Sequence, residues 1–152
     1  YYKLYGLETV ALRYFNVFGP NQDPTSQYSA VIPKFIKHMS EDKEPVIYGD
    51  GIQSRDFTYV ENVVFANILA CNSEKAPGEM INIACGESYT LLDLVKMINE
   101  ILGKNIEPHF APERPGDVKH SLARIDKAKE LLGYEVKVDF KEGLTRTIDF
   151  FH

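Results

Sequence analysis

The chain has 152 residues, 44% of them hydrophobic, and a formal net charge of −5 at pH 7. This length suffices for one domain that buries roughly 70% of its unfolded surface. The negative charge argues against a general nucleic-acid or membrane-surface binder. We therefore expect a small pocket in which a few basic residues act locally, with neither nucleic acid nor membrane as a partner.

The cysteines and histidines indicate an intracellular protein without metal chemistry. Cys71 lies in an apolar helical pattern and Cys85 follows a predicted strand, which favours two buried free thiols over a disulfide. The four histidines show no metal-ligand spacing. No signal peptide, long apolar span or lipidation motif is visible. We predict a cytoplasmic location.

The first predicted elements are the end of a helix and a strand. Residues 1–6 are typical of the last turns of a helix, with Gly6 as its stop. Residues 9–16 follow as a strand, which its apolar start predicts to be buried on both faces of a parallel sheet. Asn16 stands at the carboxyl end of this strand, where open α/β sheets bind ligands.

A polar, turn-rich loop at 19–26 precedes the next predicted helix, which has Pro33 near its start. The helical spacing of its apolar residues involves Val31, Ile32, Phe35, Ile36 and Met39. A short strand at 46–48 and a turn at 49–51 then lead to Arg55. A helix over 59–72 and a buried strand over 80–84 complete this part of the chain.

Three helices are predicted in the last third. Thr90 is a candidate N-cap with Asp93 at the third helical position, and Gly103 ends that apolar stripe. A shorter helix spans 126–133, and Asp139 caps a final one. The inward residues expected in the final helix are Leu144, Ile148 and Phe151.

Several ordered motifs give the chain a family resemblance. They are Arg13–Pro20, Val46–Asn62, Asn82–Gly86, Arg114–Asp117 and Leu131–Tyr134. Together they resemble the extended short-chain dehydrogenase/reductases, specifically the NAD-dependent nucleotide-sugar 4-epimerases, over essentially the whole chain. The resemblance implies an α/β fold of the NAD(P)-binding Rossmann type, here its late sheet strands plus the smaller substrate-binding region.

Two features of such enzymes are absent from the sequence. It contains no G-x-G-x-x-G or G-x-x-G-x-x-G phosphate loop, and no Tyr followed four positions later by Lys. We therefore interpret residues 1–152 as the C-terminal substrate-binding half, with the cofactor half and the catalytic pair upstream of residue 1. Alone it should carry no catalytic residue and no epimerase activity. It should also expose apolar surface and be aggregation-prone, partner-bound or domain-swapped.

The resemblance assigns a ligand contact to each part of a UDP-sugar. Arg55 and Arg114 would clamp the diphosphate, for which the guanidinium fork is suited, and Asn16 would donate a further hydrogen bond. The alternatives are a surface ion pair of Arg55 with Asp56 or Glu61, and a solvated turn at Arg114.

The nucleoside contacts follow in the same way. Asp117 would accept hydrogen bonds from the ribose hydroxyls unless it belongs only to a solvated Pro-Gly turn. Tyr48 offers a ring on which uracil can stack, the alternative being an ordinary strand aromatic. Ala30 and Val31 match positions that contact the base through backbone groups.

Three further residues concern the cofactor and the sugar. Tyr14 and Phe15 match residues that line the nicotinamide end of the NAD site, although aromatic core packing explains them equally. Ser121 matches a position beside the sugar C2 substituent, where a small residue admits an N-acetyl group and Tyr excludes it. Its alternative is a polar residue before the next helix.

The implied reaction removes a hydride from sugar C4 by NAD, and returns it to the opposite face of the 4-keto intermediate. The substrates would be UDP-glucose and, if Ser121 borders the C2 substituent, also UDP-N-acetylglucosamine, and the complete enzyme would be a homodimer. A nucleotide-sugar 4,6-dehydratase, a decarboxylase and a non-catalytic UDP-sugar binding module remain alternatives.

Overall fold

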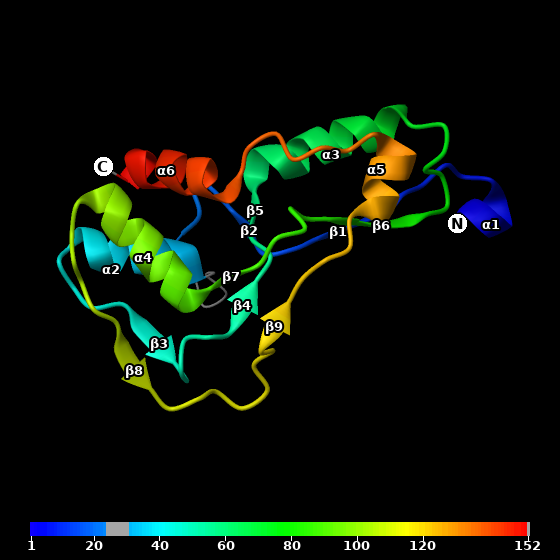
Figure 1. The fold of residues 1–152 in the computed structure, drawn as a ribbon. Helices are drawn as coiled ribbons and strands as arrows, with labels where there is room; N and C mark the ends of the chain where they lie inside the picture. The colour runs from blue at the N-terminus through cyan, green and yellow to red at the C-terminus, as the bar shows by residue number, and fades with distance from the viewer. Residues whose placement is uncertain (24–30, 152) are drawn as a thin grey trace.

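The computed structural model describes residues 1–23 and 31–151. Ala30 and residues 24–26 of the expected polar loop therefore lie outside the described residues. Figure 1 shows the helices and strands along an elongated fold, with α1 at one end and α2, α4 and α6 gathered at the other.

The elements alternate between helices and short strands. In chain order they are α1 (Tyr2–Tyr5), β1 (Ala11–Tyr14), β2 (Val17–Phe18), α2 (Val31–Ser40), β3 (Val46–Tyr48), β4 (Ser54–Arg55), β5 (Thr58–Tyr59), α3 (Val60–Asn72), β6 (Met80–Ile83), β7 (Tyr89–Thr90), α4 (Leu91–Leu102), β8 (His109–Ala111), β9 (His120–Ser121), α5 (Asp126–Leu132) and α6 (Phe140–Phe151). The chain is therefore α/β, as expected.

The first packing unit is a parallel strand pair under two helices. β1 runs parallel to β6, with Ala11 opposite Met80 and Tyr14 opposite Ile83. Figure 1 shows α3 and α5 on the same side of this pair. Their apolar faces and one face of the pair form a shared core, which includes Val63, Ala66, Ile81, Ile83, Leu132 and Tyr134.

The other face of β1 is not covered, contrary to the prediction of a strand buried on both faces. Ala11, Arg13 and Tyr14 are exposed. Among the described strands β1 pairs only with β6, so its second edge and outer face meet no sheet neighbour. Large apolar side chains lie exposed along α1, β1 and β6, namely Leu4, Tyr5, Leu7, Tyr14 and Met80.

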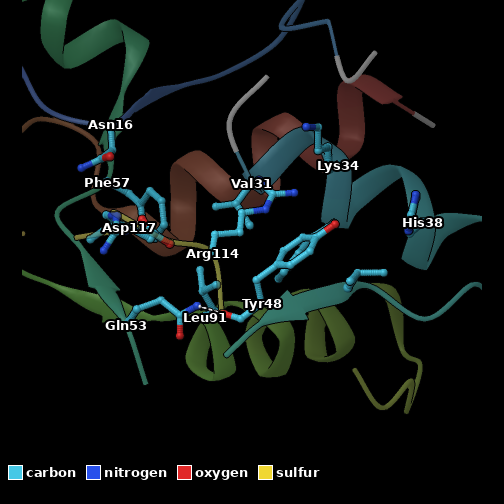
Figure 2. Close-up of a pocket in the computed structure, with 13 residues that line it drawn as sticks. Asn16, Val31, Lys34, His38, Tyr48, Gln53, Phe57, Leu91, Arg114 and Asp117 are labelled. Carbon is cyan, nitrogen blue, oxygen red and sulfur yellow. Dashed lines mark hydrogen bonds and ion pairs between the residues drawn. The ribbon is translucent and has the colours of Figure 1, made fainter. Parts of the chain in front are cut away.

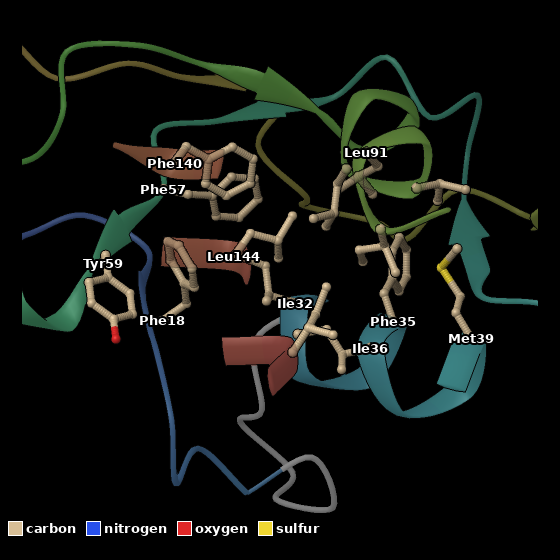
Figure 3. Close-up of a cluster of buried hydrophobic side chains, with 14 of the residues drawn as sticks. Phe18, Ile32, Phe35, Ile36, Met39, Phe57, Tyr59, Leu91, Phe140 and Leu144 are labelled. Atoms are coloured by element: carbon tan, nitrogen blue, oxygen red, sulfur yellow. The ribbon is translucent and has the colours of Figure 1, made fainter. Parts of the chain in front are cut away.

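The second packing unit is an aromatic core enclosed by α2, α4 and α6. Figure 3 shows Phe18, Phe57 and Phe140 gathered beside the apolar face of α2. The Phe57 and Phe140 rings are stacked at 5.2 Å between centroids, and Phe18 meets Phe140 edge-on at 5.5 Å. β2 and β5, which pair in parallel, connect this core to the first unit.

Local sequence signals set the helix ends as predicted. Thr90 and Asp93 form a capping box, in which the Asp93 amide donates to Thr90 Oγ1 at 3.0 Å and the Thr90 amide donates to Asp93 Oδ2 at 2.9 Å. Gly103 follows α4 in the left-handed conformation, with φ 64°. At the start of α6, Asp139 Oδ1 accepts from the Glu142 amide at 2.9 Å.

Three details differ from the sequence predictions. The strand expected over 9–16 is shorter, because β1 ends at Tyr14 and Asn16 adopts φ 36°. The two thiols predicted to be buried are not: Cys71 is exposed because it lies on the outer face of α3, and Cys85 is half-buried, although both cysteines are free. Phe151 is 37% exposed at the end of α6, where no described element covers it. No helix of the described ranges is long and apolar enough to cross a membrane.

A buried amide holds the segment before α6 against α3. Asn62 is fully buried; its Oδ1 accepts from the Lys137 and Val138 amides at 2.9 and 3.0 Å, and its Nδ2 donates to Val138 O at 2.7 Å. The segment between α5 and α6 is thereby held against the start of α3.

Candidate functional site

A cavity of about 400 Å³ lies beside the second core (Figure 2). Its walls come from α2, β3, β4, the start of α4 and the turn between β8 and β9. Six of the predicted site residues line it, namely Asn16, Val31, Tyr48, Arg55, Arg114 and Asp117. These residues are distant in sequence, so the fold alone brings them together.

Arg55 is held firmly in the cavity wall. Its Nη2 donates to Asp117 Oδ1 at 2.7 Å, and its Nη1 donates to the carbonyls of Ser54 and Lys119 at 2.9 and 3.3 Å. The Arg55 side chain is only 16% exposed. A guanidinium fixed in this way suits an anion that offers oxygens in a plane.

Arg114 lies on the face of Tyr48. The guanidinium carbon is 3.6 Å from the centroid of the Tyr48 ring, within the range of a cation–π contact. The turn that carries Arg114 is closed by a bond from the Asp117 amide to the Arg114 carbonyl at 3.3 Å. Arg114 and Asp117 therefore reach the cavity from one turn, and Arg114 covers one face of the ring proposed for uracil.

Asn16 has a strained backbone, and its side-chain amide points at the segment that contains Asp56. Its φ of 36° is in the left-handed region, which Asn tolerates better than most residues. Its Nδ2 donates to the Asp56 carbonyl at 3.0 Å, and its own carbonyl accepts from Thr58 at 3.3 Å. The strand ends thus hold Asn16 at the cavity edge.

Asp56 serves the architecture beneath the cavity. It is fully buried, and its carboxylate accepts from the amides of Cys85, Gly86 and Ala123 at 2.9, 3.0 and 3.3 Å. Burial raises the pKa of this carboxyl, although these three bonds oppose the rise. Asp56 therefore joins the loops after β6 and β9 to the segment that carries Arg55.

Sequence reasoning missed several lining residues. Lys34 and His38 lie on α2 at the same side as Val31, and Figure 2 shows both near Tyr48. The helical spacing of 31, 34 and 38 is a signal that identifies them once one member is assigned to a pocket. Gln53 also lines the cavity, and its Nε2 donates to the Tyr48 carbonyl at 2.7 Å.

Three predicted residues lie elsewhere in the described structure. Tyr14 is exposed near α3, where its hydroxyl donates to Asn67 Oδ1 at 3.0 Å. Phe15 packs on a small cluster that includes Ala84. Ser121 is half-buried in β9, directly opposite Arg55 in the β4–β9 pairing, and does not line the cavity.

The residues near β1 fit only the edge of a dinucleotide site. Tyr14 presents a 47% exposed ring at the carboxyl end of a parallel strand, and Phe15 follows it at that end. The sequence supplies no glycine-rich loop for the pyrophosphate. Tyr14 and Phe15 therefore fit the border of such a site through their aromatic rings, but not its phosphates.

The geometry defines an α/β unit with a pocket at strand ends that is lined by Arg55 and Arg114. A family model described as "NAD dependent epimerase/dehydratase family" matches residues 1–84. The chain belongs to this family.

Relatives and solved structures agree over nearly the whole chain. A putative UDP-glucose 4-epimerase of Methanocaldococcus jannaschii is 38% identical over 99% of this chain and 48% of its own length. A UDP-N-acetyl-alpha-D-glucosaminuronate decarboxylase of Bacillus cytotoxicus is 32% identical, with 99% and 48% covered. The chain thus spans about half the length of these curated relatives.

Two solved structures show the same fold. UDP-glucose 4-epimerase of Thermotoga maritima, solved with UDP-glucose, has a TM-score of 0.93 and 43% identity, with 99% of this chain and 48% of that chain covered. UDP-N-acetylglucosamine 4-epimerase of Methanobrevibacter ruminantium, in complex with UDP-N-acetylmuramic acid, has a TM-score of 0.92 and 47% identity, at the same coverage.

Proposed function

We propose that this chain is the substrate-binding portion of an NAD-dependent UDP-sugar 4-epimerase. The observation that carries the proposal is the cavity itself, in which two arginines, an aromatic ring, an amide and a carboxylate converge. Each group has a matching part in a nucleoside diphosphate sugar. The relatives that bear UDP-sugar 4-epimerase names support the substrate class.

Arg55 and Arg114 bind the diphosphate, and Asn16 adds a hydrogen bond at the cavity edge. Charge-assisted bonds of this kind contribute roughly 1.5–3 kcal/mol each when they are desolvated. Asp117 accepts from the ribose hydroxyls through the lone pairs that the Arg55 contact leaves free. Val31 lies beside the base, and the contact that the resemblance assigns to Ala30 falls outside the described residues.

Tyr48 orients the nucleotide through two partners. One face of its ring carries Arg114, so uracil stacks on the ring's other face or against the Arg114 plane. Either arrangement connects the base contact to the diphosphate contact. This coupling favours a nucleotide over a simple phosphate.

The chain's contribution to the reaction is to hold the nucleotide while leaving the sugar loosely bound. The chemistry supplied by bound NAD is removal and return of a hydride at sugar C4. Inversion at C4 requires the keto sugar to present its opposite face, and a fixed diphosphate prevents its escape during that rotation. The proton transfer is assigned in this proposal to a Tyr–Lys pair of the cofactor half.

The proposal extends to the organisation of the whole enzyme. Residues 1–152 act as its C-terminal substrate-binding half, and a Rossmann half carrying the phosphate loop and catalytic pair covers the exposed face of β1. The complete enzyme is a homodimer of the cytoplasm, where the free Cys71 and Cys85 stay reduced. Ser121 admits an N-acetyl group, so UDP-N-acetylglucosamine is a second substrate.

Calorimetric titration of the 152-residue chain with UDP tests the binding role. We expect saturable binding at one site without NAD, and no conversion of UDP-galactose to UDP-glucose with or without NAD. Absence of UDP binding contradicts the pocket assignment. Conversion by the pure chain contradicts the assignment of the catalytic pair to another segment.

A different reaction on the same nucleotide is the second candidate. The decarboxylase relative favours it, because it shares this fold region at 32% identity. A complete enzyme that releases CO₂ from a UDP-uronic acid, or water from a nucleotide hexose, would establish a decarboxylase or a 4,6-dehydratase. A binding module would hold UDP-sugars and leave them unchanged even when joined to a cofactor half.

A further inference from the structure

Asp117 is bonded to an arginine of the cavity wall. Its Oδ1 accepts from Arg55 Nη2 at 2.7 Å, and the carbonyls of Ser54 and Lys119 accept from Nη1. A guanidinium has five N–H donors. The Nε–H and one Nη2–H of Arg55 therefore have no partner among residues 1–23 and 31–151, and they remain available at the cavity.

The same residue also holds the turn that presents the second arginine. Residues 112–119 are exposed throughout, so little packing fixes this segment. Its contacts with the cavity wall include the Arg55–Asp117 ion pair and the Arg114–Tyr48 contact at 3.6 Å, and at its end the Lys119 carbonyl accepts from the Ser54 amide at 2.8 Å and from Arg55 Nη1 at 3.3 Å. The Asp117 amide meanwhile donates to the Arg114 carbonyl at 3.3 Å, beside Gly116 at φ 82°. Asp117 thus connects Arg55 through its side chain with Arg114 through its backbone.

We propose that Asp117 is a positioning residue for the diphosphate site, acting through Arg55, in addition to any contact with ribose. This inference rests on the proposed function of the pocket. An arginine that is already ordered loses less conformational entropy when an anion binds. Removal of Asp117 leaves Arg55 with only the two carbonyl bonds of its Nη1 and loosens the turn that carries Arg114, so phosphate affinity falls although a negative charge has been removed.

Ligands without ribose hydroxyls separate the two roles. The probe is 2′,3′-dideoxy-UDP, and 2′,3′-dideoxyuridine is the matching probe without phosphate. We expect Asp117→Ala to weaken dideoxy-UDP binding about tenfold and to leave dideoxyuridine unchanged. Unchanged dideoxy-UDP affinity limits Asp117 to ribose and overturns the proposal. Tighter binding of dideoxy-UDP to Asp117→Ala shows that Asp117 competes with phosphate. An equal loss of affinity for dideoxyuridine shows that the substitution disturbs the whole pocket. Either result overturns the proposal.

Glu113→Ala is the matched control, because it removes the same charge from the same turn. Glu113 does not line the cavity and only approaches Lys119, at 3.9 Å. We expect its dideoxy-UDP affinity to stay within about twofold of wild type. In an Arg55→Ala background, Asp117→Ala should weaken dideoxy-UDP binding only through its effect on the turn that carries Arg114. The loss of affinity in the double variant should therefore be smaller than the sum of the losses in the two single variants. Full additivity contradicts action through Arg55.

A measurement without ligand also tests the inference. It can be made even if the wild-type chain fails to bind UDP, and that failure would refute only the proposed function. The Arg55 Nε–H signal, assigned by its loss in Arg55→Ala, should be sharp in ¹⁵N–¹H spectra of the wild type and of Glu113→Ala. In Asp117→Ala it should exchange with water several-fold faster. An unchanged Arg55 signal in Asp117→Ala overturns the positioning role.

Discussion

Replacing Arg55 with alanine should weaken UDP binding by about 1.5–3 kcal/mol, or roughly 10- to 150-fold. The upper part of this range applies because the side chain is 16% exposed, and three partners already fix it. Arg114→Ala should cost less, about 1 kcal/mol, because Arg114 is exposed and is held mainly by Tyr48. Arg55→Lys retains the charge but loses the planar fork, so it should recover only part of the affinity.

Isothermal titration with UDP at two salt concentrations measures these effects. Arg124→Ala is the control, because Arg124 is 92% exposed, pairs with Asp126 and lies outside the cavity. This control removes one positive charge without touching the site, so it should leave affinity nearly unchanged. If Arg55→Ala matches Arg124→Ala, the phosphate assignment of Arg55 is wrong. A lower melting temperature in Arg55→Ala would show that folding, rather than binding, had been altered.

Three further predictions concern other parts of the fold. Thiol titration at pH 8 should label Cys71 and spare Cys85, because burial raises the pKa of the Cys85 thiol to about 12; equal labelling rates would contradict this. Asp93→Ala should cost about 1 kcal/mol of unfolding free energy at pH 7. Hydrogen bonds from Thr90 lower the pKa of Asp93 in the folded protein, so this stabilisation is fully present above the pKa that Asp93 has in the unfolded chain. Urea titrations should show that it is lost as the pH falls through the lowered pKa of the folded protein. In an enzyme completed by its cofactor half, Ser121→Tyr should lower the kcat/KM ratio of acetylated to plain UDP-sugars by roughly 5- to 150-fold, the effect of about 1–3 kcal/mol of overpacking. An unaltered ratio would remove Ser121 from substrate choice.

The sequence predicts those features that depend on neighbouring residues. The capping box at Thr90 and Asp93 and the helix stop at Gly103 need only a few adjacent positions, and the structure confirms them. The strand at 46–48 and the helix at 126–132 are likewise confirmed. Short-range hydrogen bonds and apolar periodicity determine these elements wherever they stand in the fold.

Local sequence patterns do not predict contacts between residues that are far apart in the sequence. Arg55 and Asp117 are 62 positions apart, and nothing in either motif shows that the two meet. The exposure of β1 depends on which strands lie beside it, a property that its own apolar residues do not encode. The family resemblance did identify six residues of one cavity, because a family motif carries tertiary information that periodicity lacks.

The position of α6 in the aromatic core has a consequence for biosynthesis. Phe140 is 2% exposed against Phe18 and Phe57, so a segment that is translated after both of them fills the space that they form. A nascent chain that has been translated only as far as α5 contains Phe18 and Phe57 but lacks Phe140. Such a chain exposes apolar surface while synthesis continues, and is then open to chaperones and to aggregation. Slow translation near residues 130–150 would therefore lower the yield of folded protein without any change in its sequence.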